Sequence, residues 1–324
     1  KSWMTQGAGT HLQWPQALLE AKEDSMDWSI DTIPDLKDKI IVVTGANSGI
    51  GLEATKVFAA RNAHVILACR NLEKGAAALE TIKQATPQAE LTLMGLDLSS
   101  LDSVRAFSDA LKQRVDHVDI LVNNAGIMAP PYSKTADGFE SQFGTNHLGH
   151  FTLTALLLPL LEQANAGRVV VISSVAHRIG RIRFNDLNWE KHYSRWLAYG
   201  QSKLANLMFA KELQRRLSAR GSKVMAVAAH PGYSNTHLQR HVPGGAVFNA
   251  IFSQSQARGA LPTLCAATSD ALKGGEYIGP SGFMEMQGEP DLAYSNALSN
   301  NTEVARKLWE VSERLTRESF LAAN

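Results

Sequence analysis

The stretch 39-KIIVVTGANSGIG-51 decides the fold expected for this chain. Its first five residues are mostly apolar and β-branched, which predicts a strand buried on both faces. The glycine-rich turn of residues 44–51 leads straight into a helical pattern that includes Ala54, Val57, Phe58 and Ala60. A turn of this kind lets backbone N–H groups and the helix N-terminus face a diphosphate. We therefore expect an α/β fold that binds a dinucleotide.

The glycine spacing of this turn departs from the usual dinucleotide fingerprint. It is G-x-x-x-G-x-G, whereas the fingerprint is G-x-G-x-x-G. Three glycines that only make a tight turn are the alternative explanation. If the turn binds the cofactor, the expected contacts are Gly45, Asn47, Ser48, Gly49, Ile50 and Gly51.

The end of the second expected strand, residues 64–68, bears on which cofactor is bound. In NAD-binding versions of such folds, an acidic residue about ~20 positions after the glycines binds the adenosine ribose, whereas an arginine accommodates the 2′-phosphate of NADP. Here Cys69 stands where the acid would be, and Arg70 follows it. Arg70 therefore indicates NADP, with a solvated surface arginine as the alternative.

The third expected strand, residues 91–96, ends at Asp97 and Leu98. Asp97 is able to accept a hydrogen bond from the adenine amino group, and Leu98 would lie beside it. Helix capping is the alternative, because Ser99 and Asp102 are spaced as in a capping box for the next helix. One strand end can serve both the cofactor and the helix.

Three further expected strands end in polar or glycine-containing sequences. Residues 118–122 lead to Asn123-Asn124-Ala125-Gly126, residues 168–172 to Ser173-Ser174, and residues 223–229 to His230-Pro231-Gly232. Open α/β sheets bind ligands at the carboxyl ends of their strands. A seventh strand is expected within residues 276–286, and a terminal helix over residues 302–319.

A helix expected over residues 199–217 begins with Tyr199 and carries Lys203 one turn later. Side chains four residues apart share a helix face. A free phenol has a pKa near ~10, and a nearby lysine cation favours the phenolate and lowers that pKa. The pair can then exchange a proton with a substrate oxygen. For an isolated Tyr-x-x-x-Lys, two polar residues on a surface helix are the alternative.

In chain order, these motifs resemble the short-chain dehydrogenase/reductase family. The shared motifs are Thr44-Gly45-x-x-x-Gly49-x-Gly51, residues 123–126, Asn146, Ser174, Tyr199-x-x-x-Lys203 and Pro231-Gly232. The resemblance covers roughly residues 35–320. Within the family, residues 68–71, 197–206 and 305–315 are most similar to the retinol dehydrogenases and to the WW-domain-containing oxidoreductase branch. The resemblance implies a Rossmann-type, doubly wound, mainly parallel seven-stranded sheet with helices on both faces.

The same resemblance implies NADP(H)-dependent hydride transfer to or from a carbonyl or alcohol, with a lipophilic small molecule as substrate. Tyr199 would act as the general acid, and Ser174, rather than Ser173, would hydrogen-bond the substrate oxygen. Lys203 would lower the Tyr199 pKa and hold the nicotinamide ribose, and Asn146 would order a proton-relaying water. Further cofactor contacts would be Asn124, Ala125, Gly126, Pro231, Gly232 and Thr236. A catalytically idle NADP(H)-binding sensor or scaffold is the alternative.

Composition bounds the remaining possibilities. The 324 residues are 44% hydrophobic, which suits one domain over residues 26–324, with residues 1–25 a native extension or an expression remnant. The formal charge of +1 gives no bulk charge for nucleic acid or an anionic membrane. The longest apolar run, residues 155–161, is too short for a membrane span. Two cysteines without metal spacing predict no metal site and fit the reducing cytoplasm.

Two segments, 237–256 and 287–301, are expected beside the substrate. The first carries Val247, Phe248, Ile251 and Phe252 on one side of a short helix, with simple packing as the alternative. The same choice between packing and a cleft wall applies to Phe184, Trp189 and Trp196. The expected helices over residues 147–161 and 199–217 carry more apolar surface than a sheet face needs, and in the family the matching helices often build a dimer. A homodimer is therefore expected.

Overall fold

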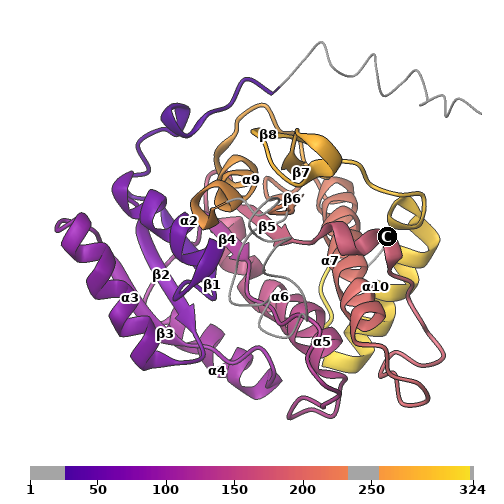
Figure 1. The fold of residues 1–324 in the computed structure, drawn as a ribbon. Coiled ribbons are helices and arrows are strands. Elements are labelled where there is room, and N and C mark those ends of the chain that lie inside the picture. The colour runs from indigo at the N-terminus through magenta and orange to yellow at the C-terminus, as the bar shows by residue number, and fades with distance from the viewer. Residues whose placement is uncertain (1–25, 233–254, 322–324) are drawn as a thin grey trace, which may run out of the picture.

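The computed structural model describes residues 26–232 and 255–321 (Figure 1). Its centre is an eight-stranded sheet with strand order β3-β2-β1-β4-β5-β6-β7-β8. All neighbouring strands are parallel except the last pair, which is antiparallel. The strands are β1 (Ile40–Thr44), β2 (His64–Cys69), β3 (Leu91–Gly95), β4 (Ile120–Asn123), β5 (Arg168–Ile172), β6 (Met225–Ala229), β7 (Tyr277–Pro280) and β8 (Pro290–Leu292).

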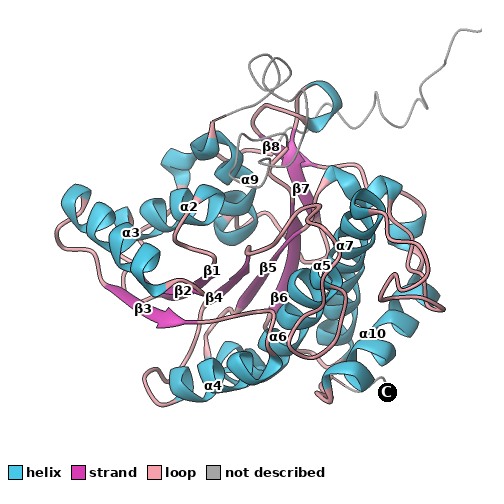
Figure 2. Cartoon of the chain, turned by 60° about the horizontal axis from the view of Figure 1, so that its bottom comes forward, coloured by secondary structure: helices cyan, strands magenta, loops and turns pink. Residues whose placement is uncertain are grey.

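Helices cover both faces of this sheet, as Figure 2 shows. One face carries α4 (Leu101–Lys112), α6 (Gly149–Gln163) and α7 (Arg195–Ala219), and the other carries α2 (Gly49–Ala60), α3 (Leu72–Ala85) and α9 (Gln256–Thr268). Neighbouring residues of a strand serve opposite faces. In β1, Val42 packs into the first core while Ile41 and Val43 pack into the second. The apolar run that predicted a strand buried on both faces is therefore explained.

Shorter helical segments complete the chain. They are η1 (Ile30–Thr32), α5 (Ser141–Phe143), the π-helical turn η2 (Gly144–Leu148), η3 (Val175–Ile179), η5 (Phe283–Glu285), η6 (Leu298–Asn300) and the C-terminal α10 (Thr302–Thr316). The segments α5, η2 and α6 follow one another without a break. The helix expected over residues 147–161 thus starts earlier than the sequence pattern indicated.

The predicted doubly wound α/β class is confirmed, and the sheet has one strand more than the seven expected. The eighth strand, β8, is three residues long and pairs with β7 in the antiparallel sense. Along it Pro290 is buried and Leu292 is exposed. Such a short edge strand with a proline has no apolar run by which the sequence could show it.

The predicted capping box of Ser99 and Asp102 is wrong. The cap of α4 is Ser100, whose hydroxyl accepts the Ser103 N–H. Ser99 instead donates its N–H and its hydroxyl to Asp97 Oδ1, at 2.9 and 2.6 Å. Either of the adjacent residues Ser99 and Ser100 could cap α4. The sequence does not show that Asp97 binds Ser99 and so leaves the cap to Ser100.

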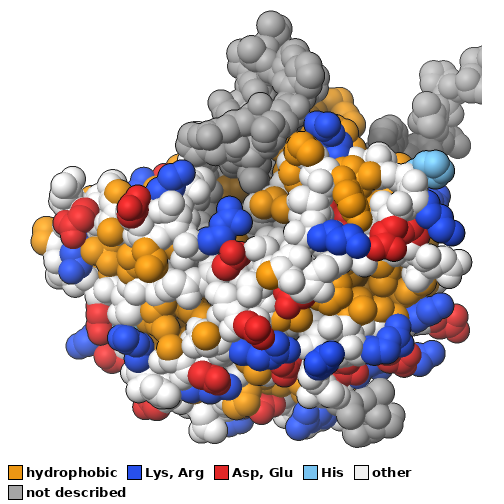
Figure 3. All heavy atoms as spheres, turned by 90° about the horizontal axis from the view of Figure 1, so that it is seen from below, with side chains coloured by type: hydrophobic (Ala, Val, Ile, Leu, Met, Phe, Trp, Pro, Cys, Tyr) orange, Lys and Arg blue, Asp and Glu red, His pale blue; other side chains and the backbone are white. Residues whose placement is uncertain are grey.

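Charged side chains of both signs are interspersed over the face seen in Figure 3, in keeping with the formal charge of +1. Within residues 26–232 and 255–321, no helix is both long enough and apolar enough to cross a membrane.

The C-terminal helix α10 covers apolar surface of α6 and α7 that faces away from the sheet (Figure 1). The ring centre of Trp309 lies 5.1 Å from that of Phe151 in α6 and 5.7 Å from that of Phe209 in α7. Phe320, just after α10, lies 4.7 Å from Trp309. This apolar surface is therefore buried within the chain. The excess apolar surface of these helices, which led us to expect a homodimer, therefore no longer supports one. The homodimer stays a prediction.

We expect Trp309→Ala to lower the free energy of unfolding by about 3–5 kcal/mol, because Trp309 is only 2% exposed and its removal leaves a cavity. Trp309→Phe is the matched control. It keeps a ring in place and removes an indole N–H that has no partner among the described residues, so its effect should be much smaller. Urea unfolding would measure both. Equal stability of Trp309→Ala and the wild-type protein would contradict this account of α10.

Candidate active site

The carboxyl ends of β1, β4, β5 and β6 lie side by side and bring the predicted site residues to one edge of the sheet. The chain reverses its direction of winding between β1 and β4. In open α/β sheets, ligands bind at such a switch point. The turn of residues 44–51 follows β1, and Asn124, Ala125 and Gly126 follow β4.

The glycines after β1 are required by close backbone approach and by left-handed conformation. Gly45 and Gly49 have φ angles of 67° and 59°, which favour glycine. A Cβ atom at Gly51 would lie 2.5 Å from Asn124 Nδ2 and 2.6 Å from the Gly45 carbonyl oxygen. Ser48 is the N-cap residue of α2, and its side chain makes no cap hydrogen bond. The Ser48 hydroxyl and the N-terminus of α2 are thus able to serve an anion.

The Thr44 side chain joins the ends of β1 and β4. Its hydroxyl oxygen accepts the N–H groups of Asn124 and Ala125, both at 2.9 Å. The side-chain amide of Asn124 donates to the Thr44 carbonyl at 2.8 Å. The Asn124 side chain therefore holds the two loops together, and its contact with the cofactor stays a prediction.

His150 in α6 completes this junction, although it was not among the predicted site residues. Its Nδ1 lies 2.9 Å from the Asn146 carbonyl oxygen and its Nε2 lies 2.9 Å from Thr44 Oγ1. A carbonyl can only accept, so Nδ1 carries the hydrogen and Thr44 donates to Nε2. Burial lowers the pKa of His150 to about 4, so the ring is neutral. A histidine within an otherwise small and apolar helix was the available signal.

Asn146 lies inside the π-helical turn η2, so the capping alternative for this residue is wrong. Its Oδ1 accepts the Ile127 N–H at 2.8 Å, and its Nδ2 donates to the Ile127 carbonyl and to Ser202 Oγ. A Cβ atom at Gly126 would come within 3.1 Å of Asn146 Oδ1. The side chain therefore holds the loop after β4 against α7. Short π-helical turns are frequent at functional sites.

The structure brings Ser174, Tyr199 and Lys203 together. Ser174 lies close enough to Tyr199 to lower the pKa of its phenol. Lys203 Nζ lies 5.8 Å from the centre of the Tyr199 ring and donates to the Ile172 carbonyl at 3.1 Å. Ser173 is buried and donates to the Lys203 carbonyl, so it points away from Tyr199, as the alternation of side chains predicted.

Burial sets the proton affinities at this centre. It raises the pKa of Tyr199 to about 12, against a smaller lowering by the hydrogen bond with Ser174. Burial also lowers the pKa of Lys203 to about 8. Lys203 was predicted to lower the Tyr199 pKa, and in the protein alone the direction is the opposite because loss of hydration dominates. A phenol that keeps its proton at neutral pH is suited to be a proton donor.

The end of β2 carries a buried thiol and an exposed cation. Cys69 is 1% exposed. Burial raises the pKa of its thiol to about 11, while hydrogen bonds from the N–H groups of Asn47 and Ala46 lower it. Arg70 is exposed, and no carboxylate of the described residues pairs with it. Nearby, Asp97 is half-buried. Leu98 packs closely against Gly149, because a Cβ atom at Gly149 would lie 2.4 Å from the Leu98 carbonyl oxygen.

The Pro231-Gly232 turn follows β6, with Gly232 at a φ angle of 66°. Its N–H donates to His230 Nδ1 at 3.2 Å. Thr236 and the proposed substrate segment that contains Val247, Phe248, Ile251 and Phe252 fall outside the described residues, apart from the last two residues of that segment. The second proposed substrate segment, residues 287–301, contains β8 and η6.

Of the three aromatic residues considered for a cleft wall, Phe184 and Trp189 lie between β5 and α7, whereas Trp196 lies in the first turn of α7. Trp189 is buried, with the Arg183 guanidinium 4.2 Å from its ring centre, and the Phe184 ring lies 4.4 Å from Lys307 Nζ. These two are packing residues. Trp196 is 42% exposed and meets the Tyr199 ring edge-on at 6.4 Å. Trp196 is therefore the one placed to form a wall beside the phenol.

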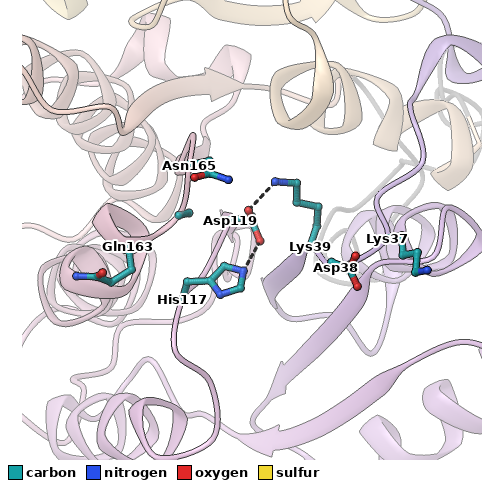
Figure 4. Close-up of a pocket in the computed structure, with 8 residues that line it drawn as sticks. Lys37, Asp38, Lys39, His117, Asp119, Gln163 and Asn165 are labelled. Carbon is teal, nitrogen blue, oxygen red and sulfur yellow. Dashed lines mark hydrogen bonds and ion pairs between the residues drawn. The ribbon is translucent and has the colours of Figure 1, made fainter.

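A charged cavity of about 260 Å³ lies at the opposite edge of the sheet, at the amino ends of β1 and β4 (Figure 4). There Asp119 accepts from Lys39 Nζ at 2.9 Å and from the Ile40 N–H at 2.9 Å, and His117 Nε2 lies 3.2 Å away. These contacts join the starts of the two strands, far from Tyr199. Among residues 26–232 and 255–321, no cluster of three or more His, Cys, Asp or Glu side chains could hold a metal ion.

Comparisons with known proteins agree with this geometry. Residues 39–244 match the family described as short chain dehydrogenase. The human protein named retinol dehydrogenase 11 is 42% identical over 86% of this chain and 85% of its own length, and human retinol dehydrogenase 13 is 41% identical over 88% and 85%. A crystal structure of an uncharacterised Mycobacterium paratuberculosis protein has a TM-score of 0.77 and 44% identity, and covers 90% of this chain and 98% of that one.

A more distant structure is that of a short chain dehydrogenase from Shigella flexneri in complex with NADP. It has a TM-score of 0.61 and 25% identity, and covers 75% of this chain and 97% of that one.

We expect the buried histidines to make the fold less stable in acid. The folded pKa of His150, about 4, is below its unfolded value of about 6.5, so the unfolded chain binds the proton more tightly. The stabilisation is present above pH ~6.5 and is lost as the pH falls toward 4. It amounts to about 2 kcal/mol less stability at pH 5 than at pH 7 for this one group.

Urea unfolding at the two pH values should show a pH dependence that is about 2 kcal/mol smaller in His150→Gln than in the wild-type protein. His192→Gln, which removes an exposed imidazole, is the control. An unchanged pH dependence in His150→Gln would show that His150 is not held neutral between Asn146 and Thr44.

Proposed function

The chain belongs to the short-chain dehydrogenase/reductase family, and on this premise we propose that it transfers hydride between NADP(H) and the carbonyl or alcohol carbon of a lipophilic substrate. Membership of this family makes it an oxidoreductase. One observation carries the proposal. Tyr199 lies beside Ser174 and has Lys203 one helical turn away, with Nζ 5.8 Å from its ring centre, and burial raises the pKa of its phenol to about 12. A nucleotide-binding sensor or scaffold has no need of such a proton-transfer centre.

The residues present fit a dinucleotide. The Gly45 and Gly51 backbones approach Asn124 and Ala125 so closely that a Cβ atom would fill the turn, and the N-terminus of α2 opens onto it. Arg70 supports NADP over NAD. It is an exposed cation directly after β2, and the strand ends in Cys69 rather than in an acidic residue. Related structures are described as complexes with NADP and NADPH. When bound, the cofactor supplies or accepts the hydride.

The proposed roles follow from position and protonation. Tyr199 donates its proton to the carbonyl oxygen during reduction, and Ser174 hydrogen-bonds the same oxygen where negative charge develops. Lys203, buried and one turn from Tyr199, holds the nicotinamide ribose. Asn146 fixes the loop after β4 against α7, and ordering of a relay water by this residue is part of the proposal.

A lipophilic substrate is supported by the relatives and by exposed apolar side chains. The similar proteins are named as retinol dehydrogenases. Trp196 stands exposed beside Tyr199, and Phe283 and Met284 are 78% and 62% exposed in the turn after β7. A reducing compartment such as the cytoplasm is supported by two free, buried cysteines, Cys69 and Cys265.

We expect Tyr199→Phe to reduce NADPH-dependent turnover by at least about 10²–10⁴-fold, because the ring is kept and only the proton donor is lost. NADPH binding, followed by its fluorescence, should be retained. Tyr132→Phe, which removes the hydroxyl of an exposed tyrosine, should leave turnover unchanged. The rate is measured as the fall in NADPH absorbance with a panel of aldehydes and ketones. Near wild-type rates in Tyr199→Phe would contradict the assigned mechanism.

We also expect Arg70→Ala to weaken NADPH binding by roughly 10- to 100-fold, the worth of a charge-assisted contact with the 2′-phosphate, while NADH binding stays unchanged. Lys83→Ala removes an exposed cation at the far end of α3 and is the control. Dissociation constants for both cofactors decide the matter. Equal affinity of the wild-type protein for NADPH and NADH would contradict the role given to Arg70.

A further inference from the structure

The turn between β7 and β8 has an unusual backbone. Met284 and Glu285 are consecutive non-glycine residues with positive φ angles, 52° and 57°. Left-handed conformation is unfavourable for residues with a side chain and persists only where surrounding contacts impose it. Phe283 and Met284 are exposed, so their side chains do not impose it. Backbone hydrogen bonds close the turn, among them Ser281 N–H to the Glu289 carbonyl and Gly282 N–H to the Gln287 carbonyl, both at 2.8 Å. The Glu285 side chain adds contacts to other segments of the chain.

The carboxylate of Glu285 joins three segments of the chain. Its Oε2 accepts from the Arg178 guanidinium at 2.6 Å, and its Oε1 accepts the Tyr294 N–H at 2.7 Å. His230 Nε2 lies 3.2 Å from Oε2, close but not aligned as a hydrogen bond. The Glu285 side chain is only 17% exposed. The Arg178–Glu285 ion pair is therefore less screened than a fully exposed pair would be. Burial lowers the pKa of His230, so its ring faces this carboxylate as a neutral imidazole at pH 7.

Arg178 connects this carboxylate to the serine side of the site. It lies in η3, the helical turn that follows Ser174 directly. The next residue back, His177, binds the Ser174 carbonyl through Nδ1 at 2.7 Å. The Arg178 guanidinium also lies 5.3 Å from the centre of the Tyr294 ring. A shift of Arg178 would therefore move the segment that carries the Ser174 hydroxyl.

His230 connects the same carboxylate to the nicotinamide side. It precedes Pro231 and Gly232, and its Nδ1 accepts the Gly232 N–H. The turn packs directly on Gly232 as well. A Cβ atom at Gly232 would lie 2.5 Å from the Met286 carbonyl oxygen and 3.0 Å from that of Glu285. The Pro231-Gly232 turn is thus packed closely against the turn between β7 and β8.

We propose that Glu285 is a positioning residue that fixes the Ser174 segment relative to the Pro231-Gly232 turn, through Arg178 on one side and His230 on the other. The kinetic part of this inference rests on the proposed function, because the two segments would then form the serine and nicotinamide walls of the hydride-transfer gap. Small misplacements across such a gap cost large factors in rate. Glu285 touches neither reacting atom in this account.

The test compares Glu285→Gln with Glu289→Gln in the full chain. The first change keeps the shape and the acceptor for the Tyr294 N–H but removes the charge that Arg178 and His230 face. Glu289 lies in the same turn and is exposed, and its side chain forms none of the ion pairs found among the described residues. Arg178→Met breaks the same ion pair from the other side. Circular dichroism confirms that each variant is folded.

Hydrogen exchange gives a readout that does not depend on activity. Glu285→Gln should speed amide exchange at least tenfold in residues 175–180 and at Gly232, segments more than 50 positions apart in the sequence, whereas Glu289→Gln should not. Faster exchange confined to residues 281–296 would overturn the proposal. If the wild-type protein reduces no carbonyl compound, the proposed function fails, and the exchange result still decides whether Glu285 couples the two segments.

Kinetics tests the consequence for rate. We expect Glu285→Gln and Arg178→Met each to lower kcat by about 10- to 100-fold, with KM for NADPH changed less than about threefold. The double variant should lose no more than either single variant, because both changes break one contact. A primary isotope effect with NADPH deuterated at the transferred position should grow in Glu285→Gln. Wild-type kcat in Glu285→Gln, or strictly additive losses, would overturn the proposal.

Discussion

The Thr44 hydroxyl is the point on which the cofactor side of this protein depends. It accepts two backbone N–H groups from the loop after β4 and donates to a histidine of α6. Thr44 and His150 are buried and the two loop residues are half-buried, and a buried polar group without a partner costs about 1–3 kcal/mol. The hydroxyl thereby satisfies a strand end, a neighbouring loop and a helix at once. The glycine-rich turn begins immediately after it, so the geometry of the dinucleotide site follows from this junction.

Around Tyr199, too, single groups make several hydrogen bonds. Lys203 and Asn206 both donate to the Ile172 carbonyl, and Asn146 binds both Ile127 and Ser202. The polar groups of α7 and η2 are mostly bonded to backbone, which makes the site rigid before any ligand arrives. The high pKa of Tyr199 is a consequence of that burial. In the proposed function, this burial suits Tyr199 to donate its proton to a substrate oxygen during reduction.

The sequence predicted the sheet and the main site residues because both depend on local patterns. Buried parallel strands are continuous apolar runs, and glycines at close approaches have no substitutes. The order of the motifs then identified Ser174, Tyr199 and Lys203 as neighbours. What it could not predict depends on contacts between distant segments. The role of His150 needs Thr44 from β1, the proton affinity of Tyr199 needs the burial of α7, and the short β8 exists only because β7 lies beside it.

The long sequence separation between α10 and the helices that it covers has a consequence for biosynthesis. Phe151 and Phe209 leave the ribosome more than 90 residues before Trp309 does, judged from their sequence numbers. Until residues 302–316 have emerged, the surface that α10 will cover is open to water and to other chains. Transiently exposed apolar surface promotes aggregation in proteins of this size. This core therefore closes only after α10 has emerged, and a chain that terminates shortly before Thr302 would keep Ser174, Tyr199 and Lys203 and still lack a closed core.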